Sequence, residues 1–156
     1  HQTVLHFLKQ KLRTDPVSLS LQRTSVASLM DRSLSVSKQS VDATEARELL
    51  KLASRWLIIE TNNGGLRLLD SQQLQQFLPG KLMAQTEGNF DLLEISPESL
   101  RIAELHMQAT LREALDLLDE THVDAIFISG FIASSPYPDS GILTRADINN
   151  YIQTPQ

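Results

Sequence analysis

Two residues three positions apart, Thr144 and Asp147, could together bind a ligand that carries both an anionic group and hydroxyl groups. They stand at the start of an expected helix, and a helix N-terminus offers free N–H groups and positive potential to an anion. The carboxylate of Asp147 could accept hydrogen bonds from two hydroxyls. Arg145 is the obvious counter-charge, with Arg101 and Arg112 as further candidates. The same Thr-x-x-Asp spacing also resembles a capping arrangement that only starts a helix, so both interpretations stay open.

The remaining candidate residues form no catalytic or metal-binding pattern. The histidines lack metal-ligand spacing, and we expect surface or helix-capping positions for all four: His1, His6, His106 and His122. Three acidic residues on one expected helix are interpreted as its solvated face rather than as a paired-carboxylate active site: Asp116, Asp119 and Glu120. No glycine-rich run leads to Gly-Lys-Ser/Thr, and no serine has a nucleophile-elbow setting. The sequence therefore predicts a protein that is not an enzyme and holds no metal.

An internal repeat is the most informative feature of the sequence. In each copy an N-cap residue precedes a glutamate by three positions, which is the capping-box spacing: Asp42 with Glu45, and Thr110 with Glu113. Apolar residues then continue at helical spacing. They are Ala46, Leu49, Leu50 and Ala53 in the first copy, and Ala114, Leu117 and Leu118 in the second.

Each of these helices is followed by two strands and a second helix. In the first copy the strands are expected at 56–59 and 66–69, around a tight turn at 62–65 that contains two glycines. In the second copy they are expected at 125–128 and 141–143, around a longer turn at 130–140. The returning helices begin at Asp70 and Thr144, and another strand precedes each first helix, near 34–36 and near 100–105.

Each copy therefore has the order strand, helix, strand, strand, helix. A half of ~60 residues would bury little surface alone. We therefore predict an α+β (mixed α/β) fold in which two pseudo-symmetric β-α-β-β-α repeats pack as a pair.

The segments between the repeats are expected to be connectors. Pro79-Gly80 is expected to close the first unit, and a further strand is a candidate at 90–95. Residues 4–12 predict a short amphipathic helix that ends near Asp15-Pro16. The resulting division is an N-terminal helix and linker at 1–25, a first repeat at 26–80, a connector at 81–99 and a second repeat at 100–156.

Composition limits the class of protein. The chain has 156 residues, 41% of them hydrophobic, which fits one globular domain. Lys and Arg outnumber Asp and Glu eleven to seven in residues 1–81, but are outnumbered three to twelve in residues 87–156. No basic face with interleaved aromatics exists, so we expect no nucleic-acid partner. The longest apolar runs are about four residues, whereas a spanning helix needs ~20. Because the chain opens at His1 without a signal pattern, we expect a piece of a longer protein.

The order of elements, with Thr144-x-x-Asp147 closing the second unit, resembles the CBS (cystathionine β-synthase) domain pair over about residues 26–78 and 100–152. The resemblance implies two pseudo-symmetric halves that often dimerise into a flat disk. In CBS proteins that bind adenosine nucleotides, the residue matching Thr144 lies near phosphate and the one matching Asp147 holds ribose hydroxyls. The resemblance therefore implies ATP, ADP or AMP as a regulatory ligand of the second repeat.

The first repeat has different residues at the matching positions, Asp70 and Gln73. A carboxylate beside a phosphate would repel it, and an amide is a poorer acceptor for ribose hydroxyls than a carboxylate. We therefore expect no nucleotide site in the first repeat.

A narrower resemblance lies in residues 15–32, 55–59 and 68–71. Residues 15–32 are similar to the segment that joins the last membrane helix of bacterial ClC-type proteins to their first CBS repeat, and residues 55–59 and 68–71 also resemble that family. The resemblance implies the cytosolic regulatory and dimerisation module of a homodimeric chloride channel or anion–proton exchanger, a multi-pass protein of the bacterial inner membrane. Its partners would be a second copy and the membrane domain of its own chain. The alternative is a CBS-pair sensory domain of a soluble enzyme or of a different transporter.

Overall fold

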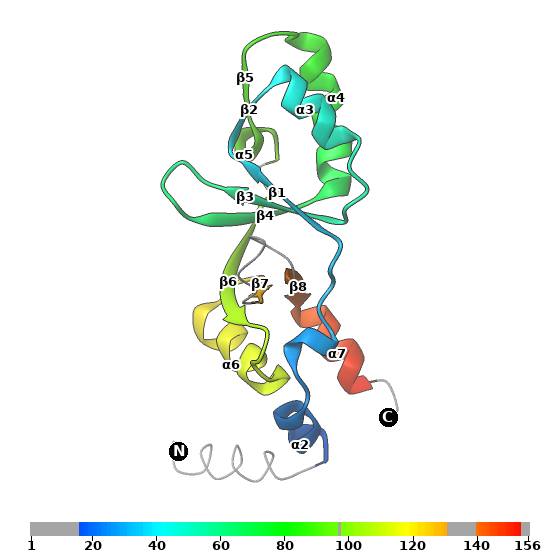
Figure 1. Ribbon diagram of the computed structural model, residues 1–156, viewed down its shortest axis with the longest axis vertical. Coiled ribbons are helices and arrows are strands. Elements are labelled where there is room, and N and C mark those ends of the chain that lie inside the picture. The colour runs from blue at the N-terminus through cyan, green and yellow to red at the C-terminus, as the bar shows by residue number, and fades with distance from the viewer. Residues whose placement is uncertain (1–15, 97, 131–139, 154–156) are drawn as a thin grey trace.

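The computed structural model describes residues 16–96, 98–130 and 140–153 (Figure 1). The helix expected at 4–12 and most of the turn expected at 130–140 lie outside the described residues. The described part forms two halves, one above the other in Figure 1. None of the helices in this part is both long and apolar enough to cross a membrane.

Each half contains one predicted β-α-β-β-α unit. The first unit consists of β1 (Leu34–Lys38), α3 (Ala43–Leu50), β3 (Trp56–Glu60), β4 (Leu66–Asp70) and α4 (Ser71–Ala84). The second consists of β6 (Leu100–His106), α6 (Leu111–Thr121), β7 (Ala125–Ser129), β8 (Ser140–Thr144) and α7 (Arg145–Gln153). The strand order in the sheet is β1-β3-β4-β6-β7-β8. In each half the first and second strands of the unit are parallel, β1 with β3 and β6 with β7. The second and third strands form an antiparallel hairpin, β3 with β4 and β7 with β8. The predicted pseudo-symmetry is therefore confirmed.

The expected caps start the first helix of each unit. The amide of Glu45 donates to Asp42 Oδ1 at 2.8 Å and the amide of Asp42 donates to Glu45 Oε1 at 3.2 Å, which completes a capping box. The amide of Glu113 donates to Thr110 Oγ1 at 3.2 Å. These local bonds satisfy N–H groups that would otherwise lack partners, so the two helix starts follow directly from the sequence.

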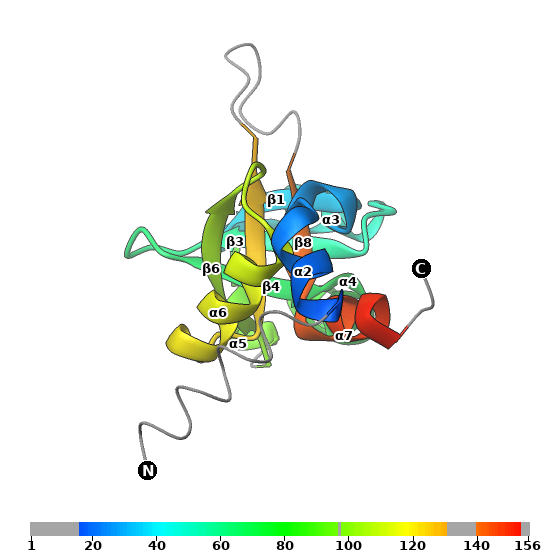
Figure 2. The same cartoon turned by 90° about the horizontal axis from the view of Figure 1, so that it is seen from below.

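The segment that precedes each unit packs on the other half of the molecule. Helix α2 (Pro16–Arg23) and the 3-10 helix η1 (Val26–Ser28) lie on the second half, as the view from below shows for α2 (Figure 2). The amide of Val26 donates there to Ala109 O at 2.9 Å. Conversely, β5 (Asn89–Asp91) pairs with β2 (Ser40–Asp42) of the first half, and α5 (Leu92–Ile95) follows it there. The segments that precede the two units, residues 16–31 and 89–95, are called lead segments below. Each packs on the opposite half, so the lead segments are exchanged between the two halves.

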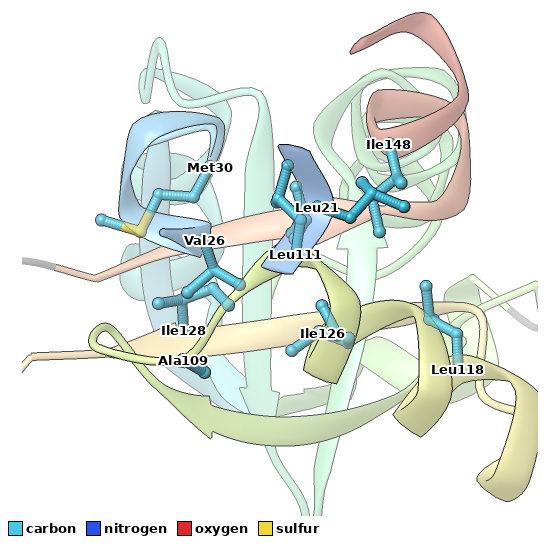
Figure 3. Packing of buried hydrophobic residues seen from close by; sticks show 11 residues of the cluster. Leu21, Val26, Met30, Ala109, Leu111, Leu118, Ile126, Ile128 and Ile148 are labelled. Carbon is cyan, nitrogen blue, oxygen red and sulfur yellow. The ribbon is translucent and has the colours of Figure 1, made fainter. Parts of the chain in front are cut away.

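The exchanged segments contribute to the core of each half. Leu21, Val26 and Met30 are buried in the second half among residues of α6, β7, β8 and α7 (Figure 3). Phe90, Leu92 and Ile95 occupy the corresponding place in the first half. Burying one such side chain contributes about 1.5–3 kcal/mol, so neither unit has its full core without the lead segment of the other.

A third cluster joins the two halves. It consists of Trp56, Ile58 and Leu68 from the first half and Ala125, Phe127 and Ile142 from the second. Strands β4 and β6 also pair directly, with Leu68 opposite Leu100. The predicted packing of the repeats as a pair is thus confirmed, and the shared cluster is its physical basis.

Two expectations about the connector are wrong. Helix α4 does not end at Pro79-Gly80 but continues to Ala84, because Leu78 and Leu82, on either side of the proline, both pack on the first-half core. One backbone hydrogen bond is lost there. The strand expected at 90–95 ends at Asp91, whose carboxylate caps α5 by accepting from the amides of Leu93 and Glu94.

Helix α2 was not predicted from the sequence. It begins at Pro16, where the sequence predicts the end of a helix. Proline is favoured at the first position of a helix, because its missing N–H would have no partner there anyway.

Candidate functional site

The two residues singled out for ligand chemistry lie together where β8 passes into α7. The amide of Thr144 donates to Asp147 Oδ2 at 2.9 Å, and the amide of Asp147 donates to Thr144 Oγ1 at 3.2 Å. Both side chains are half-buried. The two residues therefore form the predicted capping arrangement, and its hydrogen bonds hold the Asp147 carboxylate in one orientation.

The capping arrangement leaves groups for a ligand. It uses Oδ2 of Asp147, and Oδ1 accepts no hydrogen bond from the described residues. The first amides of α7, those of Arg145 and Ala146, have no carbonyl partner inside the helix. A cap and a ligand site are therefore compatible at this helix start.

The arginines expected as counter-charges are engaged by neighbouring groups. Arg145 Nη2 lies 2.7 Å from Asp119 Oδ1 on α6, with both side chains about half exposed. Arg101 donates to the carbonyl of His122 at 2.9 Å, and Arg112 pairs with Asp116 on the same helix at 3.2 Å. Exposed ion pairs of this kind contribute only about 0–1 kcal/mol, so Arg145 can leave Asp119 for a stronger anion.

A segment of the first repeat reaches β8 just ahead of the site. Asp31 and Ile142 exchange two backbone hydrogen bonds of 2.8 and 2.9 Å. At Gly141 a Cβ atom would lie only 2.8 Å from the carbonyl oxygen of Asp31 and from Cγ of Met30. The close approach therefore requires glycine at position 141, and it brings the first repeat against the strand that carries Thr144.

Arg55 joins this arrangement from the first half. Its Nη1 lies 3.3 Å from Asp31 Oδ2, and its guanidinium carbon lies 4.9 Å from the centre of the Trp56 ring. No local pattern in the sequence predicts a role for Asp31, Arg55 or Gly141 at the site. Residues 31 and 142 are far apart in the sequence, so no local pattern indicates their pairing.

The matching position in the first repeat is built differently. Asp70 Oδ1 accepts from the amide of Gln72 at 2.9 Å, and the Gln73 side chain donates to Glu98 Oε2 at 2.9 Å instead of returning to the strand end. A cleft of about 650 Å³ lies beside this helix start. Its lining residues are Leu52, Ala53, Ser54, Arg55, Asp70, Ser71, Gln72 and Gln75.

The remaining candidates lie on the surface. His106 and His122 are exposed, and His122 ends α6 in the left-handed conformation with φ of 55°; His1 and His6 lie outside the described residues. Within the described ranges, no three potential metal-ligating side chains come together. Asp119 and Glu120 are exposed on α6.

Tyr151, one helical turn beyond Asp147, was not indicated by the sequence analysis. Its hydroxyl lies 2.6 Å from Ser20 Oγ and 3.0 Å from Thr24 Oγ1, both on the α2 segment. The hydrogen bond with Ser20, helped by that with Thr24, lowers the pKa of Tyr151 below its ordinary value, although burial acts in the opposite direction. The helix that carries the candidate site is thus tied to the N-terminal segment.

No protein-family model and no curated protein matches the sequence. Solved structures do match the fold, and those of CBS domain proteins define its class. A hemolysin-like protein containing a CBS domain from Oenococcus oeni PSU is 10% identical, covers 88% of this chain and 96% of its own, and has a TM-score of 0.50. The predicted α+β fold of a CBS domain pair is confirmed.

Two other solved structures also match this chain. The CBS domain of the bacterial CNNM/CorC family Mg²⁺ transporter is 11% identical, covers 97% of this chain and 92% of its own, and has a TM-score of 0.50. CBSX2 in complex with AMP is 22% identical, covers 82% of this chain and 95% of its own, and has a TM-score of 0.43.

Proposed function

We propose that this chain is a regulatory module that binds an adenosine nucleotide at the start of α7. The observation that carries the proposal is the cap between Thr144 and Asp147, which orients the carboxylate and leaves its Oδ1 without a partner among the described residues. In a CBS-pair fold, a nucleotide would place its phosphates at the amides of Arg145 and Ala146. Its ribose hydroxyls would donate to Oδ1 of Asp147.

Regulation requires that the nucleotide bind one conformation more tightly than another. The site has a structural basis for such a difference, because β8 is paired with Asp31, which also lies 3.3 Å from Arg55 of the first half. A ligand at the end of β8 would therefore favour one arrangement of the two halves over another.

For the parent protein we propose a ClC-type chloride channel or anion–proton exchanger, with this module on the cytoplasmic side of the bacterial inner membrane. The resemblance of residues 15–32, 55–59 and 68–71 supports the proposal. A second candidate is the module of a different transporter, which the structural similarity to the CNNM/CorC CBS domain favours. Sequencing the part of the gene that encodes the residues before this chain separates both candidates from a soluble enzyme. A transporter would have long apolar segments there, whereas a soluble enzyme would have a catalytic domain.

We also propose a homodimer. Leu52 and Phe77, on the helical side of the first half, are each more than 40% exposed although large and apolar. Leu118 of α6 is buried in the second-half core and is unavailable, whereas Leu115 and Leu117 are half-buried, as Leu49 and Leu50 are. The exposed Leu52 and Phe77 therefore make the helical side of the first half the better candidate for the dimer surface.

Calorimetry with ATP, ADP and AMP tests the nucleotide proposal. Loss of a hydrogen bond to a charged acceptor costs ~1.5–3 kcal/mol, or roughly tenfold to a hundredfold in affinity. We expect Asp147→Ala to weaken binding by this factor. Gln73→Ala, the matched change in the first repeat, should leave the affinity unchanged.

Two results would contradict the nucleotide proposal. Absence of heat with all three nucleotides at millimolar concentration would leave the Thr144–Asp147 pair as a helix cap alone. An equal loss of affinity in Asp147→Ala and Gln73→Ala would show that the nucleotide binds elsewhere.

A further inference from the structure

Helix α2 has few bonds of its own to keep it folded. It contains eight residues, of which only Ser18 and Leu21 are buried. An isolated helix of this length is marginal in water. Its helical state therefore depends on docking against the second half, mainly through Leu21 and through the hydroxyls of Ser20 and Thr24.

The hydroxyl groups that hold α2 lie within hydrogen-bond distance of one another. Thr24 Oγ1 donates to the carbonyl of Ser20 at 2.8 Å. The phenol oxygen of Tyr151 lies 2.6 Å from Ser20 Oγ and 3.0 Å from Thr24 Oγ1. One side chain of α7 thus satisfies two side chains of the α2 segment.

The contacts with α2 lie on successive turns of α7, immediately after the candidate site. Ile148 follows Asp147 directly, is fully buried, and lies in the same cluster as Leu21 (Figure 3). Tyr151 stands one turn further on. Because α7 has only nine residues, fraying of its first turn would displace Ile148 and loosen Tyr151.

We propose that α2 is a detachable strap whose docking depends on the state of the N-terminus of α7. A group that orders this helix start, whether the cap alone or a bound nucleotide, would hold Ile148 and Tyr151 in place and so keep α2 docked. Linkage makes the effect reciprocal, so that release of α2 would weaken binding at the helix start by the same factor. The nucleotide part rests on the function proposed above, but the dependence on the cap does not.

Hydrogen exchange of the 156-residue chain tests the strap. The amides of Thr24 and Val26 report docking, since they donate to Ser20 O and Ala109 O. Loss of one net hydrogen bond should speed their exchange about fivefold to tenfold. We expect this in Tyr151→Phe, which keeps the ring, and in Asp147→Ala, which removes the carboxylate that accepts from the amide of Thr144 and so loosens the first turn of α7.

The control is Asp70→Ala, which loosens the first turn of α4 in the other half by removing its N-cap side chain and should leave the exchange of Thr24 and Val26 unchanged. Addition of ATP to the wild-type chain should slow their exchange. If the amides of Thr24 and Val26 exchange faster in Asp147→Ala but ATP does not bind the wild-type chain, the strap proposal is supported and the proposed ligand is contradicted. If Asp147→Ala and Asp70→Ala exchange alike at Thr24 and Val26, the strap proposal is wrong, whether or not ATP binds.

Discussion

Gly141 offers a sharp test of how the first repeat contacts β8, because any side chain there meets the backbone of another segment. In Gly141→Ala the new Cβ would lie 2.8 Å from the carbonyl oxygen of Asp31 and 2.8 Å from Cγ of Met30. Both separations are well inside ordinary van der Waals contact. Met30 is buried, so neither neighbour can move without disturbing the second-half core.

Overpacking of this kind costs about 1–3 kcal/mol. In a chain of this length each kcal/mol lowers the thermal midpoint by about 2–4 °C, so we expect Gly141→Ala to unfold roughly 2–12 °C below wild type. Circular dichroism during heating gives the midpoint. Faster exchange of the amides of Asp31 and Ile142, which pair with each other, would locate the damage.

Gly80→Ala is the matched control. Gly80 lies inside α4 and nothing approaches the position of its Cβ within 4 Å. Alanine is favoured over glycine inside a helix by about 1 kcal/mol, so this variant should be at least as stable as wild type. Equal midpoints for Gly141→Ala and Gly80→Ala would refute the close contact between residues 30–31 and β8.

Three further outcomes are expected. In a Tyr137→Phe background, absorbance at alkaline pH should show that the pKa of Tyr151 lies below 10.0, and Ser20→Ala should raise it. Because the pKa is lower in the folded state, the contribution of Tyr151 to stability develops as the pH rises from that pKa and is complete above 10.0. An unshifted transition would contradict the bond to α2. Light scattering should give a dimer of the 17.5 kDa chain that Leu52→Glu weakens and Val17→Glu does not, whereas a monomer at tens of micromolar would contradict the proposed dimer. Pro79→Ala should raise the midpoint, since it restores a backbone donor inside α4, and a lower midpoint would show that the helix depends on the proline.

Local chemistry made much of the fold predictable. The capping pairs at Asp42 and Thr110 determine where two helices begin, and the apolar runs at 56–59 and 125–128 become buried strands. The Thr144–Asp147 pair also forms as its spacing suggests. In each case the residues that determine the structure lie within a few positions of one another, so one sequence is sufficient.

The features that the sequence did not reveal depend on distant contacts. Helix α2 is stabilised by Leu21 in the core of the other repeat and by Tyr151, more than a hundred residues away. Helix α4 continues through Pro79 because Leu82 still finds apolar partners. The engagement of Arg145 by Asp119 likewise depends on how α6 and α7 pack. Local propensity gives no information about such partners.

Three sets of inferences stay predictions: the segment boundaries at 25, 80 and 99, the nucleotide-binding roles of Thr144, Arg145 and Asp147, and the membrane domain of the parent protein. The exchanged lead segments bear on the first of these, because residues 16–31 pack with the second repeat and residues 89–95 with the first.

A crystal structure of the chain grown with ATP would locate the nucleotide. We expect one nucleotide at the start of α7, with its ribose hydroxyls within hydrogen-bond distance of the Asp147 carboxylate and a phosphate at the amides of Arg145 and Ala146. A nucleotide beside Asp70 and Gln73 at the start of α4, or none at either helix start, would contradict the nucleotide proposal.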